Sequence, residues 1–306
     1  MAPASDGWLA SPSDEARPDG VRPCRSELST GHAATRGFWK SFDAMDRAAR
    51  NDVIAALDDA AKAHPLESEL HLLLGLAHLW RLAEPLAGED TLASVLAESG
   101  FGSKEHLEEA YALCPTDHRI PAWLGPVLFN MGEALGDDDM VKAGLDVLDA
   151  GIAHYPAFVL FSKMLVFADR PALDAQFQSA LEAVRDNIDA CSVGTTPQGS
   201  TSPSTGLRLS FDPACNNTPL VPHNIEGSGL FLGDLLAKAG LATEARATFE
   251  SSGLAPNYAS WPFDTVRADR LATLDARVAA FATESPSDDP EVAWRSPLQC
   301  AYCHAK

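Results

Sequence analysis

Proline follows the end of an amphipathic helical pattern at four places in this chain. The segments are Ala63-His64-Pro65, Leu113-Cys114-Pro115, His154-Tyr155-Pro156 and Leu254-Ala255-Pro256. Proline has no N–H to donate, and it disfavours helical backbone in the residue before it, so a helix must end at each of these points. The recurrence predicts an all-α chain in which consecutive helices are joined by turns.

Apolar residues recur at helical spacing between these prolines, as Phe38, Phe42 and Met45 do in the first stretch. We expect a first helix from near Thr35, a last one over 266–281, and helices between them at 51–63, 66–83, 104–113, 120–135, 139–154, 158–167 and 171–190. Asp139 is expected to cap the helix that it begins.

The composition divides the chain into five segments. We expect an extended arm over 1–33, helical regions over 34–190 and 223–283, a Ser/Thr/Pro-rich loop over 191–222, and a linker with a terminal tail over 284–306. Within the loop, Arg208 to Phe211 has a weak strand pattern. A loop of this length in a compact protein is either functional or without regular structure.

The segment Gly229 to Phe249 has small residues where two helices would approach closely, a turn glycine at Gly240, and Ala245 and Phe249 in the second helix. This pattern resembles tetratricopeptide-type helical repeats. The other units are longer and less regular, so the resemblance implies an irregular array of antiparallel helix pairs over about 35–280. Such arrays use a concave surface to bind peptides or proteins.

The chain carries Cys300-Ala301-Tyr302-Cys303-His304, a C-x-x-C-H run. Two thiols at this spacing reach both vinyl groups of one porphyrin edge, and the adjacent histidine is placed to bind the iron. The run resembles the attachment motif of c-type cytochromes, a resemblance that covers five residues. It implies one covalent haem c, with Cys300 and Cys303 as thioether anchors and His304 as proximal ligand. A redox dithiol or half of a zinc site is the alternative.

The sixth iron position would decide the chemistry, because a histidine or methionine there closes the site and an open position admits small molecules. His223, in Pro222-His223-Asn224, is the first candidate for a distal ligand. His71 and His78 lie seven residues apart on one face of a buried helix; they are possible iron ligands, but we expect them to be interior residues with satisfied hydrogen bonds. Met131 and Met164 are likewise expected in the core.

Four further cysteines accompany the motif, namely Cys24, Cys114, Cys191 and Cys215. Because the number of cysteines outside the motif is even, they can form two disulfides, as is typical of an oxidising compartment. Four cysteines allow three pairings. We favour Cys191 with Cys215, because they border the loop, and hence Cys24 with Cys114. Four buried free thiols are the alternative.

The formal net charge of −20 over 306 residues excludes a general nucleic-acid binder, which needs a positive surface. No apolar run reaches the length of a membrane span. The segment Met1 to Gly7 lacks the basic start and apolar stretch of a secretory signal. Since haem c is attached outside the bacterial cytoplasm, we expect a mature form from which a signal peptide has been removed.

Three functions remain open, and no catalytic residue is assigned. The first is an extracytoplasmic, periplasmic or extracellular monohaem c-type cytochrome that transfers electrons and docks a redox partner protein by electrostatics or on its concave helical face. The second is a haem enzyme that acts on peroxide or another small oxidant. The third is a haem-free helical interaction scaffold with a redox or metal-binding C-x-x-C.

Overall fold

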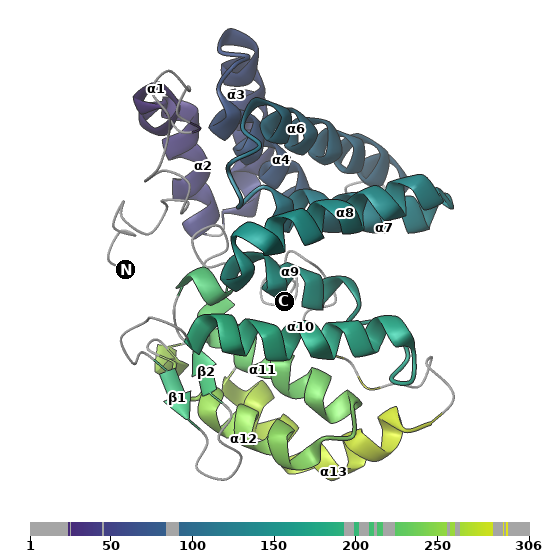
Figure 1. The fold of residues 1–306 in the computed structure, drawn as a ribbon. Coiled ribbons are helices and arrows are strands. Elements are labelled where there is room, and N and C mark those ends of the chain that lie inside the picture. Colours follow the sequence, from purple (N-terminus) through teal and green to yellow (C-terminus); the bar gives the residue numbers. More distant parts are fainter. Residues whose placement is uncertain are drawn as a thin grey trace. The chain divides into compact units, whose positions relative to one another are not determined.

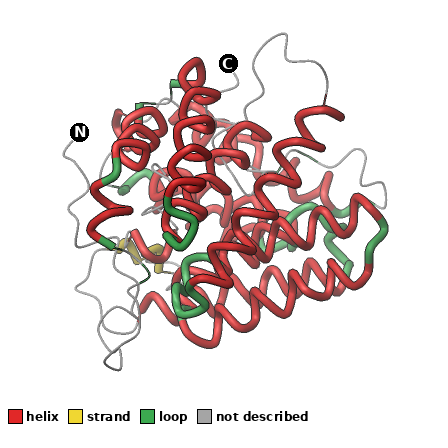
Figure 2. Tube along the Cα trace, turned by 90° about the horizontal axis from the view of Figure 1, so that it is seen from above, coloured by secondary structure: helices red, strands yellow, loops and turns green. Residues whose placement is uncertain are grey.

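The computed structural model describes residues 24, 26–44, 46–83, 92–192, 199–201, 208–210, 213–216, 224–255, 258–260, 264–283, 290 and 292. Within these ranges the chain is all-α apart from one short two-stranded ribbon (Figure 1, Figure 2). The chain divides between Tyr155 and Pro156 into two units. We refer to the described residues up to 155 as the N-terminal unit and to those from 156 as the C-terminal unit.

The N-terminal unit begins with three short helical pieces and continues as packed helices. They are α1 Glu27–Gly31, α2 Ala33–Asp43, the turn η3 Arg47–Ala49, α3 Arg50–Ala63, α4 Ser68–Ala83, α5 Leu92–Val95, the π-helical η4 Leu96–Gly100, α6 Phe101–Leu113, α7 Pro121–Leu135 and α8 Asp138–His154. Helix α4 packs against α6, α7 packs antiparallel against α8, and α3 packs on α4 (Figure 1).

The C-terminal unit repeats the pairing with different helices. Its elements are α9 Pro156–Val166, α10 Ala175–Ser192, β1 Gly199–Thr201, β2 Arg208–Ser210, the turn η5 Pro213–Asn216, α11 Asn224–Lys238, α12 Ala242–Ser252, the turn η6 Tyr258–Ser260 and α13 Asp264–Phe281. Helix α9 packs with α10 and α11 with α12, while α13 contacts both members of the second pair. Strands β1 and β2 are antiparallel, with Ser200 opposite Leu209, so the strand predicted at Arg208 is confirmed.

The helix ends predicted from proline are confirmed, and three of the four share one backbone geometry. The residue before the proline has φ/ψ of −133°/64° at His64, −141°/77° at Cys114 and −138°/64° at Tyr155. All three lie outside the helical region, as the proline ring requires. The N–H of Glu67 then donates to His64 O, and that of Asp117 to Cys114 O, both at 3.1 Å. Equivalent turns therefore precede α4 and α7.

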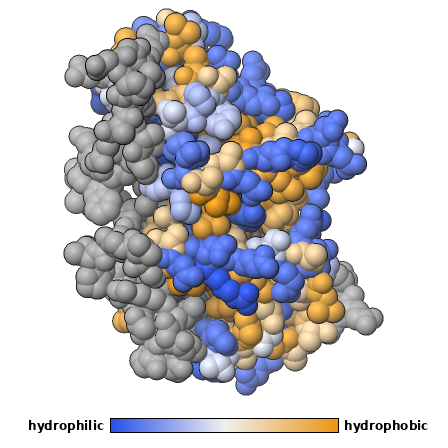
Figure 3. Space-filling model, in the orientation of Figure 1, coloured by the Kyte–Doolittle hydropathy of each residue, from blue (hydrophilic) through white to orange (hydrophobic). Residues whose placement is uncertain are grey.

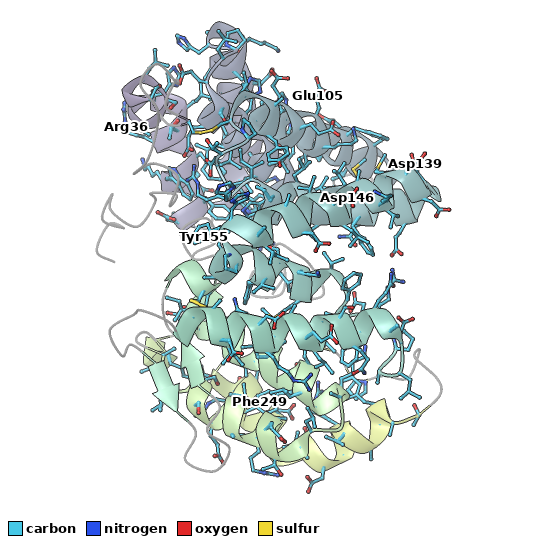
Figure 4. The ribbon with its side chains drawn as sticks, in the orientation of Figure 1. Arg36, Glu105, Asp139, Asp146, Tyr155 and Phe249 are labelled. Atoms are coloured by element: carbon cyan, nitrogen blue, oxygen red, sulfur yellow. A yellow bond between two sulfur atoms is a disulfide. The ribbon has the colours of Figure 1, made fainter. Side chains whose placement is uncertain are left out.

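Two helix pairs approach so closely that only glycine fits at the contact. A Cβ on Gly144 of α8 would lie 2.6 Å from the Phe129 nitrogen and 2.7 Å from the Gly125 carbonyl oxygen, both in the backbone of α7. In the C-terminal unit, a Cβ on Gly233 of α11 would overlap the ring of Phe249 on α12 (Figure 4). Overlap with backbone cannot be relieved by turning a side chain.

A buried ion network fixes the N-terminal unit where α4 and α7 begin. Arg119 is 2% exposed; it donates from Nε to Asp117 Oδ1 at 2.8 Å and from Nη2 to Glu69 Oε2 at 2.9 Å. Burial alone would lower the pKa of the guanidinium, but the two carboxylates outweigh burial and hold the pKa above its ordinary value. Removing one partner would leave a buried charge uncompensated.

The C-terminal unit has a second buried ion network between α11 and α13. Asp234 is fully buried and accepts from Arg277 Nη2 at 2.9 Å, with Arg270 Nε 3.1 Å from its Oδ1. Burial lowers the pKa of Arg277, and Asp234 counteracts that effect. The two arginines therefore neutralise a carboxylate inside the unit and link its last helix to α11.

Three expectations about helix starts are wrong. Helix α10 begins at Ala175 rather than Pro171, after a turn in which Asp174 N donates to Pro171 O at 2.9 Å. Helix α6 begins at Phe101 rather than Lys104, and the turn η4 leads into it. Asp137, not Asp139, caps α8, because Asp137 has extended backbone and its Oδ1 accepts from Met140 N at 2.9 Å. Asp139 already lies in the first helical turn, where its carboxylate interacts favourably with the helix dipole instead.

The structure pairs Cys24 with Cys114 and Cys191 with Cys215, as the sequence favoured. The Cα atoms are 5.4 Å apart in the first pair and 6.1 Å in the second, within the range of disulfides. All four residues are buried. The two bonds are consistent with an oxidising compartment. Separately, no helix in the described part of the chain is long and apolar enough to cross a membrane.

We predict that Gly144→Ala destabilises the N-terminal unit by about 1–3 kcal/mol, because its Cβ would overlap backbone atoms of α7. Chemical unfolding followed by circular dichroism measures the change. Gly37→Ala is the matched control: it lies within α2, and its Cβ would meet no atom within 4 Å. The control should be neutral or stabilise by up to about 1 kcal/mol. Equal effects would contradict the close packing of α7 and α8.

We also predict that the double variant Cys24→Ala/Cys114→Ala unfolds at a lower temperature than the parent. The bond joins residues 90 positions apart, and closing a loop of that size constrains the unfolded chain by about 4–5 kcal/mol in the chain-entropy model. Calorimetry of both proteins under oxidising conditions measures the shift. An unchanged melting temperature would contradict formation of this disulfide in solution.

Candidate functional site

The residues predicted to hold haem lie outside the described part of the chain. Cys300, Cys303 and His304 belong to the last segment, and His223 immediately precedes the described start of α11. The structure therefore leaves their assignment as a prediction. The structure does show the disulfide partners of the other four cysteines and the surroundings of seven histidines.

The two disulfides use all four cysteines outside the C-x-x-C-H run. The chain has six cysteines, and four are paired within the two units. Cys300 and Cys303 are consequently the two cysteines that no described disulfide occupies. Two cysteines three positions apart, the second followed by histidine, are the residues that covalent haem attachment needs.

The histidines gather in the N-terminal unit. Seven of the nine lie between His32 and His154, and each of these seven has another histidine ring beside it. They form the pair His32 and His64, the pair His118 and His154, and a cluster of three on α4 and α6. We refer to His71, His78 and His106 as the histidine cluster.

The cluster forms because α4 and α6 pack together. His71 and His78 occupy one face of α4, and His106 faces them from α6. The Nδ1 atoms of His71 and His106 are 3.3 Å apart, and the ring of His78 lies parallel to that of His106 at a centroid separation of 6.0 Å. His71 and His78 are buried, at 8% and 9% exposure, whereas His106 is half-buried.

Hydrogen bonds indicate which nitrogens of His71 and His106 carry protons. His71 Nε2 lies 3.2 Å from the carbonyl oxygen of Pro65, which can only accept, so Nε2 of His71 donates. When His71 is neutral its Nδ1 must then accept, and the proton between the two rings belongs to His106 Nδ1. In neutral His106, Nε2 is then the unprotonated nitrogen and carries a lone pair.

Burial favours the neutral form of two members of the cluster, His78 and His106. Burial, followed by the charge on His106, lowers the pKa of His78 to about 4. Burial and then His71 lower the pKa of His106, while the carboxylates of Glu105, Asp58 and Glu109 act in the opposite direction. Glu105 projects from α6 (Figure 4). A neutral imidazole keeps a lone pair that can bind a metal ion or accept a proton.

The other two histidine pairs are arranged differently. The rings of His118 and His154 are stacked 4.5 Å apart and nearly parallel, at 9°. Their in-plane nitrogen lone pairs therefore do not converge. His32 caps α2, because its Nδ1 accepts from Ala34 N at 3.2 Å, so that nitrogen is already used. Within the described residues, no group of three or more His, Cys, Asp or Glu side chains is arranged to hold a metal ion.

The sequence identified part of the cluster. His71 and His78 are buried as expected, and Met164 is fully buried on α9, whereas Met131 is half-buried. His106 was not anticipated, because its helix has ordinary amphipathic spacing and its partner lies 35 residues earlier in the chain. The only sequence signal was that a buried helix carried two histidines, which need polar partners from a neighbouring helix.

Comparisons with known proteins find no matching family model, no matching curated protein and no matching solved structure.

We predict that stability falls as pH drops from about 6.5 toward 4, and that His78 causes part of the fall. Its folded pKa of about 4 lies below the ordinary 6.5, so the unfolded state binds the proton first and the stabilisation present above pH 6.5 is lost in this window. The full effect is on the order of 3 kcal/mol. Urea unfolding of the parent and of His78→Gln at several pH values measures it.

The variant should lose less stability than the parent between pH 7 and pH 4.5. Groups other than His78 titrate alike in both proteins, so only the difference between the two curves reports on His78. Parallel curves would contradict a buried, neutral His78.

Proposed function

We propose that this protein is an extracytoplasmic c-type cytochrome that carries one covalent haem and transfers electrons. Cys300 and Cys303 form the thioether bonds, and His304 is the proximal iron ligand. The haem supplies the reversible one-electron change of its iron. The chain supplies the attachment, the axial ligand and the surface on which a redox partner docks.

The disposition of the cysteines carries this proposal. Four of six are paired in buried disulfides, and the two left over stand in the C-x-x-C-H run. Disulfides form in oxidising compartments, and haem c is attached in such a compartment in bacteria. The same location therefore accounts for both sets of cysteines, and we place the protein in the periplasm or outside the cell.

We propose further that the helical body is an irregular tetratricopeptide-like scaffold. Equivalent turns precede α4 and α7, and the N–H of Tyr258 donates to Ala255 O at 3.0 Å in the same register after α12. The contact between Gly233 and Phe249 places a small residue against a large one where the two helices of a repeat cross. These features support recurrence of one helix-pair unit.

Charge, rather than an apolar face, favours partner docking. Large apolar side chains that are exposed in the described residues lie at turns and helix ends: Leu28, Leu66, Phe101, Leu135, Leu173 and Leu254. Figure 3 shows hydrophilic residues interspersed with smaller apolar patches on the face in view. With a net charge of −20, the protein would attract a basic redox partner by long-range steering.

We predict that the protein acquires covalent haem when it is exported in a host with c-haem maturation machinery. Haem staining after denaturing electrophoresis and a reduced pyridine haemochrome spectrum measure the attachment. The stoichiometry should be one haem per chain, and Cys300→Ala/Cys303→Ala should carry none. Absence of haem from a folded parent protein with both disulfides formed would refute the proposal and leave a haem-free interaction scaffold.

The ferric spectrum of the loaded protein tests the electron-transfer assignment. A low-spin spectrum that becomes high-spin in His223→Ala would identify His223 as the sixth ligand. If the spectrum of this variant stays low-spin, the sixth iron ligand is a residue other than His223. A high-spin parent would contradict the closed site and favour a haem enzyme that acts on peroxide.

A further inference from the structure

The histidine cluster offers two nitrogens at the separation that a tetrahedral metal ion requires. Ligand nitrogens about 2.0–2.1 Å from a tetrahedral zinc ion lie about 3.3–3.4 Å from each other. The Nδ1 atoms of His71 and His106 are 3.3 Å apart. Square-planar or octahedral neighbours at the same bond length would lie closer, about 2.9 Å apart. The spacing therefore favours zinc over copper(II) or nickel.

We propose that His71 and His106 form a zinc-binding site between α4 and α6, with solvent or an external ligand in the remaining positions. The site rests on these two helices and does not depend on the haem. Zinc would replace the hydrogen bond between the two rings, and His106 would move its proton to Nε2.

The surroundings of His71 match those of a metal-binding histidine. Its Nε2 donates to the Pro65 carbonyl, which fixes the ring and directs the lone pair of Nδ1 toward His106. Ligand histidines commonly use their second nitrogen in this way. Pro65 is also one of the helix-ending prolines, so the turn before α4 holds the carbonyl in position.

Access and charge also suit a cation. His106 is half-buried, so part of its side chain reaches solvent, whereas His71 is buried. Asp58, Glu105 and Glu109 act electrostatically on His106 as negative charges. One of the two Nδ1 atoms accepts in the hydrogen bond between the rings and therefore carries a lone pair.

His78 is a neighbour of the site rather than a ligand. Its ring is parallel to His106, and Gly102 of α6 allows it to pack closely, because a Cβ at Gly102 would lie 2.9 Å from its Nε2. No group of three such side chains in the described residues is arranged to hold an ion together. A two-histidine site leaves more positions to solvent and binds more weakly than a closed structural site.

The test uses full-length, untagged protein with both disulfides formed and with Cys300→Ala/Cys303→Ala, which removes the only thiols that would compete for metal. We expect one Zn²⁺ per chain by calorimetric titration. Co²⁺ as a probe should give the intense visible absorption of a tetrahedral site. His106→Ala, at a half-exposed position, should weaken binding by more than about tenfold. His118→Ala is the matched control and should not change the affinity.

Nitrogen NMR of histidine-labelled parent protein provides a measurement that needs no further substitution. Zinc should shift the Nδ1 resonances of two histidines, and these should be His71 and His106. The proposal is overturned if zinc fails to bind, if His106→Ala binds as the parent does, or if His118→Ala weakens binding equally. Equal loss of binding in His78→Gln would also overturn the two-ligand assignment. None of these outcomes bears on haem attachment.

Discussion

Three long helices of the N-terminal unit, α3, α6 and α8, end where proline disfavours their continuation, and the packing of that unit builds on this constraint. The residue before the proline adopts the same non-helical backbone at His64, Cys114 and Tyr155. At the first two sites the chain then makes a hydrogen-bonded turn that begins the next helix. These turns connect α3 to α4 and α6 to α7. Cys114 occupies one of these positions, so the disulfide to Cys24 is anchored by the same geometry.

Glycine and buried charge then set how closely the pairs pack. At Gly144 the backbones of α7 and α8 meet with no room for a methyl group. Arg119 joins the start of α4 to the turn before α7 through Glu69 and Asp117, and in the other unit Asp234 links α11 to α13 through two arginines. Breaking either network would strand a charge in a low-dielectric interior. These contacts make each unit a defined scaffold rather than a loose stack of helices.

The sequence predicted the features that local chemistry controls. Helix ends followed from proline, and the favoured cysteine pairing followed from the loop between Cys191 and Cys215. Local rules failed at η4, where no helix was expected. They also failed at the cap of α8, because local preference does not distinguish which of three consecutive aspartates is the N-cap residue. His106 could not be predicted, because its contact with His71 exists only once α4 and α6 pack, and periodicity does not specify which residues face each other across a helix pair.

Four of the six cysteines form two structural disulfides, and we propose that the other two, Cys300 and Cys303, form one haem attachment site. Peptide mapping by mass spectrometry, under non-reducing conditions after export with haem-maturation machinery, tests this division most directly. The account predicts linked peptides for Cys24 with Cys114 and for Cys191 with Cys215, and one haem-bearing peptide that contains Cys300 to His304. A peptide in which Cys300 or Cys303 is disulfide-bonded to one of the other four would contradict it.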